Sequence, residues 1–179
     1  MASAPLPPPL PVPIEQVKAY LRIAGSDEDA LLAGLVRTAS ELCEGFTRMA
    51  LIEREVEETV AARPAWTRLE IAPVRAILAV ASAAADGPAI PLAADAFAID
   101  IDSAGDGWVR LLRTAGAARV AVRYRAGRAA DWNGVPEPLR QGVVRMAAHL
   151  YTHRDREDGR GPPAAVAALW LPYRRLRLS

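Results

Sequence analysis

Apolar residues recur every three or four positions in the first part of the chain, the spacing that places side chains on one face of an α-helix. In residues 14–23 the apolar positions are Val17, Tyr20 and Leu21. In residues 26–47, which open with the potential helix cap Ser26, they are Leu31, Leu35, Leu42 and Phe46. We therefore expect two helices that bury these stripes in a shared core.

From residue 51 to residue 126 the period shortens to two, and short runs rich in β-branched and aromatic residues alternate with turn signals. The alternation is clearest in residues 119–125. Val120, Val122 and Tyr124 fall on one side there, and Arg119, Arg123 and Arg125 share the opposite side with Ala121. This pattern predicts an antiparallel β subdomain.

The helical period returns after residue 134 and predicts a long helix with a buried stripe of Leu139, Val143, Met146, Ala147 and Leu150. A short helix follows over 164–170, and Pro172 ends it. The expected class is α+β. A small helical bundle (14–50 and 134–170) carries an inserted β subdomain (51–133), between a Pro-rich extended arm (1–13) and a C-terminal arm (171–179).

Composition and charge fit a folded protein that assembles. The chain is 51% hydrophobic with a net charge of +1, and no run approaches the roughly 20 apolar residues of a membrane span. Residues 1–60 contain 5 basic and 10 acidic residues, whereas residues 134–179 contain 8 and 4. A chain that is acidic at one end and basic at the other can stack on copies of itself.

Catalytic and metal sites are not expected. Cys43 is the single cysteine and lies on a predicted helix, which favours a buried, inert thiol. His149 and His153 have the spacing of metal ligands but lack a third ligand. Residues 100–111 have only part of a calcium-loop pattern, and a β-hairpin explains them better. Nucleophile and phosphate-loop motifs are absent, so we expect no enzyme and no cofactor.

The chain ends with LWLPYRRLRLS, in which cationic and large apolar residues follow one another without an acidic residue. Chain termini without a binding role are usually small, polar and poorly ordered. We therefore expect a docking arm that inserts apolar side chains into a partner and pairs its arginines with acidic groups. The docking residues would be Tyr173, Arg174, Arg175, Leu176, Arg177 and Leu178.

Three stretches resemble one known family. VKAYLRIAGSDEDALLAGLVRTASELCEGFTRMALI (17–52), YRAGRAADWNGVPEPLRQGVVRMAAHLYTHRD (124–155) and LPYRRL (171–176) resemble, in the same order, head–tail connector (adaptor) proteins of long-tailed bacteriophages and phage-like gene transfer particles. The resemblance implies a structural protein that forms a ring, commonly of twelve copies, below the portal. It also implies that the ring extends the DNA channel and provides the surface for the next head-completion protein.

This resemblance gives the partners and the location that we expect. They are a homo-oligomeric ring, the portal, a tail-side stopper or head-completion protein, and non-specific contact with channel DNA, but no membrane. The protein would be made in the bacterial cytoplasm and reside at the head–tail interface of a particle. Two alternatives remain open: a small nucleic-acid-binding protein that uses the Arg119, Arg123 and Arg125 strand face, and a neighbouring stopper-type protein.

Overall fold

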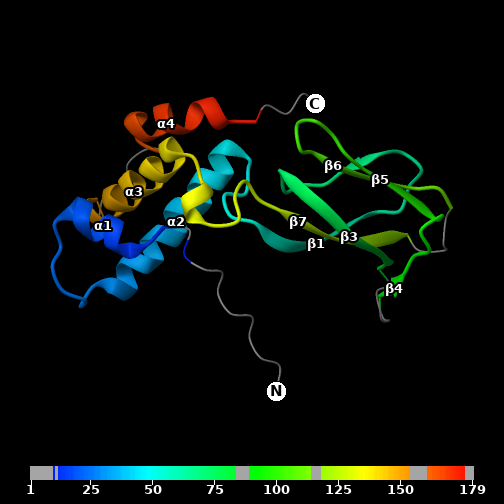
Figure 1. Cartoon of the computed structure of the whole chain (residues 1–179), viewed down its shortest axis with the longest axis horizontal. Coiled ribbons are helices and arrows are strands. Elements are labelled where there is room, and N and C mark those ends of the chain that lie inside the picture. Colours follow the sequence, from blue (N-terminus) through cyan, green and yellow to red (C-terminus); the bar gives the residue numbers. More distant parts are fainter. Residues whose placement is uncertain (1–9, 11, 84–88, 114–117, 154–160, 176–179) are drawn as a thin grey trace, which may run out of the picture. The chain divides into compact units, whose positions relative to one another are not determined.

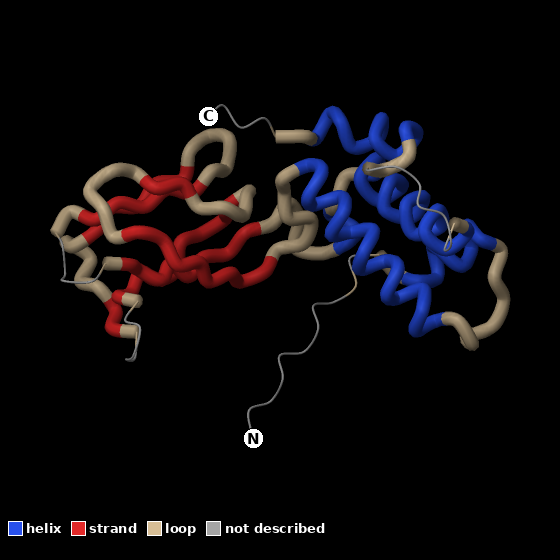
Figure 2. Tube along the Cα trace, turned by 180° about the vertical axis from the view of Figure 1, so that it is seen from behind, coloured by secondary structure: helices blue, strands red, loops and turns tan. Residues whose placement is uncertain are grey.

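The computed structural model confirms the α+β class and separates the chain into two compact units. It describes residues 10, 12–83, 89–113, 118–153 and 161–175. The helical unit comprises residues 1–47 and 131–179, and the β unit comprises residues 48–130. Figure 2 shows this division, because the helices and the strands occupy different parts of the tube. Most of the predicted Pro-rich arm lies outside the described residues.

The described residues of the helical unit form four α-helices: α1 (Ile14–Leu21), α2 (Asp29–Thr47), α3 (Glu137–Thr152) and α4 (Ala164–Trp170). Single 3₁₀ turns precede α3 (Trp132–Gly134) and follow α4 (Leu171–Tyr173). α3 is the central helix, since α1, α2 and α4 all pack against it (Figure 1). The described helices include none long and apolar enough to cross a membrane.

The start of α2 differs from the sequence-based expectation. The helix begins at Asp29, and Ser26 is not its cap; the Ser26 carbonyl accepts a hydrogen bond from the Asp29 amide at 3.1 Å. The Asp29 carboxylate pairs with the Lys18 ammonium of α1 at 2.7 Å. The acidic first turn of α2 therefore also links it to the neighbouring helix.

The prediction of the buried faces of α1 and α2 was only partly right. Val17 is fully buried, but Tyr20 is 54% exposed. On α2 the stripe with Leu31 and Leu42 faces outward, and these two leucines are 40% and 42% exposed. The residues that α2 buries are Leu32, Val36, Ala39, Ser40, Cys43 and Thr47. Apolar pairs at adjacent positions give the helix two apolar faces, and the period alone does not select between them.

Trp170 packs the short helix α4 against α3. Its indole is fully buried and lies against the backbone of Gly142, where a Cβ atom would stand 2.0 Å from the indole nitrogen. Phe46 of α2 packs on the same indole with ring centroids 5.9 Å apart. A single aromatic side chain therefore joins three helices. The indole fits against α3 because residue 142 is a glycine and has no side chain.

The β unit contains two antiparallel sheets. One has the order β1 (Arg54–Ala61), β7 (Arg119–Ala126), β3 (Val74–Ser82) and β4 (Ile90–Pro91). The other has the order β2 (Thr67–Arg68), β6 (Gly107–Leu111) and β5 (Phe97–Ile101). The core contains inward side chains from both sheets: Val60, Val74, Val80, Val120, Val122 and Tyr124 from the first, and Val109 and Leu111 from the second.

Replacing Gly142 by alanine should destabilise the helical unit, because the new methyl group overlaps the Trp170 indole. We expect the free energy of unfolding to fall by about 2 kcal/mol, as in other overpacked cores, measured by urea unfolding of the full chain. The matched control is Gly34→Ala on α2, since no described atom lies within 4 Å of the added Cβ. That change should stabilise by about 1 kcal/mol. Equal effects at the two sites would contradict this packing.

Candidate functional site

The first candidate surface is the C-terminal segment, whose described part is attached to the helical unit. The Arg174 guanidinium lies over the Phe46 ring, 5.5 Å from its centroid. The Arg175 amide donates a hydrogen bond to the Thr47 carbonyl at 3.0 Å. Thr47 is the last residue of α2, so the chain is held at the C-terminal end of that helix as far as Arg175.

The six predicted docking residues thus divide into two groups. Tyr173 is half-buried, Arg174 is exposed and Arg175 is half-buried on the helical unit. Leu176, Arg177 and Leu178 lie outside the described residues. The attachment places the described part of the segment, as far as Arg175, close to the C-terminal end of α2.

The second candidate surface is the arginine row, which we define as Arg119, Arg123 and Arg125 of β7. All three are exposed, while Val120, Val122 and Tyr124 between them are buried. The alternation predicted from the sequence is therefore confirmed. In the paired strand β1, Glu57 lies opposite Arg123 and Glu55 lies opposite Arg125. On the other side, Ala79 and Ala76 of β3 occupy the corresponding positions.

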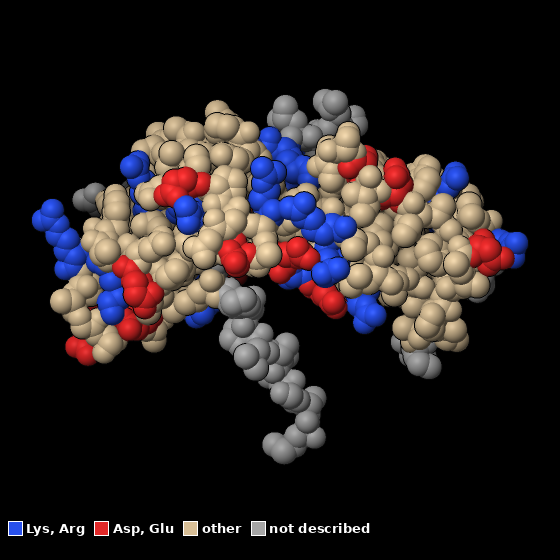
Figure 3. Space-filling model, in the orientation of Figure 1, with Lys and Arg blue, Asp and Glu red and all other residues tan. Residues whose placement is uncertain are grey.

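Acidic groups weaken the positive field of the arginine row. Arg125 pairs with Glu53 at 3.4 Å, and Arg119 donates to the Thr59 carbonyl at 3.2 Å. Exposed pairs of this kind contribute little stability, but they compensate charge locally. Figure 3 shows acidic and basic side chains intermixed over the face that it draws. A face of mixed charge is better suited to bind a partner protein with an alternating charge pattern than to bind the continuous phosphate backbone of a nucleic acid.

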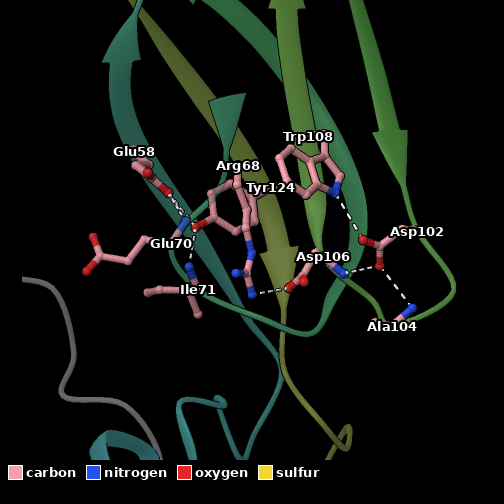
Figure 4. A network of polar contacts seen from close by, with 9 residues as sticks. All are labelled: Glu58, Arg68, Glu70, Ile71, Asp102, Ala104, Asp106, Trp108 and Tyr124. Atoms are coloured by element: carbon pink, nitrogen blue, oxygen red, sulfur yellow. Dashed lines mark hydrogen bonds and ion pairs between the residues drawn. The ribbon is translucent and has the colours of Figure 1, made fainter. Parts of the chain in front are cut away.

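The β unit also contains a tyrosine–glutamate pair of the kind that active sites use. The Tyr124 hydroxyl donates to Glu58 Oε2 at 2.9 Å and accepts a hydrogen bond from the Ile71 amide at 3.2 Å (Figure 4). The Glu70 amide donates to the same carboxylate oxygen at 2.9 Å. Burial, and then the hydrogen bond to Glu58, raise the pKa of Tyr124. The ring is fully buried, and the hydroxyl links β7 to Glu58 of β1 and to the segment before β3, which gives the pair a structural role.

The calcium-like segment is a hairpin turn. Asp102 Oδ1 accepts hydrogen bonds from the Ala104 and Asp106 amides, both at 2.9 Å, and Oδ2 accepts one from the Trp108 indole at 3.1 Å (Figure 4). Arg68 pairs with the Asp106 carboxylate at 2.7 Å. These contacts occupy the carboxylates within the loop. The hairpin predicted for this stretch is confirmed, as β5 and β6.

The other titratable candidates are also used structurally. The His149 and His153 rings stack with centroids 4.3 Å apart, and the described residues contain no group of three side chains that could hold a metal ion. Cys43 is fully buried on α2. Burial, with a smaller effect from Glu44, raises the pKa of its thiol. The thiol is therefore unreactive.

Comparison with solved structures identifies what the two units together resemble. One similar chain belongs to the neck of an empty gene transfer agent particle computed with C6 symmetry; it shares 27% identity, with a TM-score of 0.78, and the match covers 99% of this chain and 96% of that one. A chain of the neck of the native particle computed with C12 symmetry shares 30% identity, with a TM-score of 0.69 and coverages of 94% and 93%. The chain belongs to a family of gene transfer agent neck proteins.

A third similar chain, from the virion of a native gene transfer agent particle, matches at 28% identity with a TM-score of 0.76. No protein-family model and no curated protein matches the sequence. The likeness spans both units, so the β unit is a regular part of this neck protein. The family supports a structural role in a phage-like particle and a ring of identical copies, since the related necks were computed with six-fold and twelve-fold symmetry.

The Tyr124 network makes the stability of this neck protein sensitive to alkaline pH. With its pKa raised, Tyr124 stays protonated in the folded chain where the unfolded chain ionises, above about pH 10. The contribution of Tyr124 to the free energy of unfolding is therefore fully present below pH 10. Above pH 10 this contribution should fall by about 1.4 kcal/mol per pH unit. In unfolding experiments from pH 8 to 11, the Tyr124→Phe variant should be less stable than the wild type at pH 8. Above pH 10 its free energy of unfolding should fall less steeply than that of the wild type. An unchanged slope would contradict this.

Proposed function

We propose that this neck protein is the head–tail connector (adaptor) of its particle. Twelve copies would form a ring under the portal, extend the DNA channel and offer the docking surface for a tail-side stopper or head-completion protein. The observation that carries the proposal is the full-length likeness to a neck chain in a structure computed with C12 symmetry. The adaptor-like sequence stretches 17–52, 124–155 and 171–176 support it independently.

The C-terminal segment is the part that we assign to the portal. Its described part is attached to the helical unit as far as Arg175, and the four residues that follow would reach about 13 Å if extended. Leu176 and Leu178 offer apolar groups of modest size, and Arg177 offers a bidentate partner for a carboxylate. One such segment binds weakly, because ordering it costs entropy. A ring presents many segments at once, and this multivalency gives strong attachment.

The arginine row is assigned to contact with a neighbouring protein, with passing DNA as a secondary contact. Glu55 and Glu57 lie in register beside Arg125 and Arg123. A protein surface with the opposite alternation satisfies both signs, while a phosphate backbone would be repelled by the two carboxylates. These acidic neighbours weigh against a protein whose main function is to bind nucleic acid through this strand.

Ending the chain after Arg175 should separate folding from docking. Because Arg174 and Arg175 keep their contacts to Phe46 and Thr47, the free truncated protein should unfold at the temperature of the full chain. Electron microscopy of particles from a producer with this truncation should show DNA-filled heads without tails beside free tails. Removing the whole gene should give the same picture.

The control is Ser179→Ala, which keeps the segment and should give normally tailed particles. Tailed particles after the truncation would overturn the docking role of residues 176–179. Tailed particles after removal of the whole gene would overturn the connector function itself.

A further inference from the structure

Helix α2 has a second apolar face that the helical unit leaves uncovered. We use the name α2 ridge for the uncharged residues on this side of the helix: Leu31, Gly34, Leu35, Thr38, Leu42 and Gly45. Gly34 and Leu35 are half-buried and the other four are exposed, and the exposed charged residues Arg37 and Glu41 belong to the same helix. Leu31 and Leu42 are 40% and 42% exposed, although the opposite face of the same helix is fully buried. A helix that is apolar on two sides is typical of one buried from both sides.

Two glycines within the ridge have open space where a side chain would stand, as far as the described residues extend. A Cβ atom added at Gly34 or Gly45 would meet no described atom within 4 Å. Both lie within the 19-residue helix α2, where glycine is a poorer helix former than alanine. Packing among the described residues of the helical unit therefore does not require a glycine at either position. Between leucines on an exposed face, they allow the backbone of another element to approach closely.

The same unit contains an open groove between α1 and α3, two helices that pack together (Figure 1). This α1–α3 groove measures about 380 Å³ and lies between Gln16, Ala19 and Tyr20 of α1 and residues Glu137, Arg140, Gln141 and Val144 of α3. Tyr20 is 54% exposed at its edge. Glu137 is already paired with Arg140 and accepts a hydrogen bond from Gln141 at 2.9 Å. Ala19 and Tyr20 are both exposed, so they are the groups that a partner would cover, whereas Val144 is already buried.

We propose that the α2 ridge of one copy packs into the α1–α3 groove of the next copy, and that this contact closes the ring. The inference rests on the proposed function, since it needs identical neighbours, and the related necks computed with C6 and C12 symmetry provide them. A ring requires two different surfaces on each subunit. The ridge and the groove share no residue and belong to one compact unit.

The sequence pattern supports the same pair of surfaces. Tyr20, Leu31, Leu35 and Leu42 have the period of core residues, but in the single chain Tyr20 and the Leu31–Leu42 stripe are largely outside the core. Their apolar character is explained if they become buried when copies meet. Tyr20 lies at the groove and the three leucines lie on the ridge. Contact between the two surfaces would therefore bury apolar side chains of both.

The first test places an arginine on the ridge. Gly34→Arg should fold, with an unfolding temperature at or above that of the wild type, because the position is open and arginine favours a helix. A producer carrying this variant should lose tailed particles. The matched control, Ala168→Arg, adds the same side chain at an exposed position of α4 and should leave tails intact. Normally tailed particles that contain Gly34→Arg would overturn the inference.

The second test links the two surfaces directly. In particles carrying both Tyr20→Cys and Leu42→Cys, a short bis-maleimide should produce a ladder of linked copies on a denaturing gel. Each single variant should give no ladder, because Cys43 is buried. Assembled particles of the double variant that give no ladder would overturn the ridge-and-groove contact.

The two proposals fail in different ways. If removing the whole gene leaves tailed particles, the connector function is wrong. If removing the gene abolishes tails but Gly34→Arg does not, the connector function stands and the α2 ridge is not the ring contact.

Discussion

The packing of Trp170 against the Gly142 backbone is the constraint on which the helical unit depends. α4 has only seven residues, and a helix of that length is not stable by itself in water. The buried indole holds α4 on α3 and also contacts Phe46 of α2. After the 3₁₀ turn Leu171–Tyr173, Arg174 and Arg175 contact Phe46 and Thr47, so the described part of the C-terminal segment lies against the same end of α2.

The two units use different means to become rigid. Aromatic and aliphatic packing around the central helix α3 dominates the helical unit. The β unit adds hydrogen-bond networks between strands and in turns, such as Tyr124 with Glu58 and Asp102 with the turn amides. These networks have the residue types of active sites, but the Tyr124 hydroxyl and the Asp102 carboxylate bond to neighbouring strands and turn amides.

Much of the fold could be predicted from the sequence because its strand and helix periods differ clearly. The β7 alternation assigned the arginine row to the exposed face, since a strand has only two sides. The inward face of α2 could not be predicted. Leu31 and Leu32, Leu35 and Val36, and Leu42 and Cys43 supply apolar side chains to adjacent faces. The Gly142–Trp170 contact also escaped prediction, because it joins residues 28 positions apart and no local pattern marks it.

The most direct test of the connector account is a reconstruction of the neck of this protein's own particle by electron cryomicroscopy. The account predicts a ring of twelve copies between the portal and the next neck protein, with residues 176–179 of each copy in contact with the portal. A neck in which this chain forms no ring, or in which those residues point away from the portal, would contradict it.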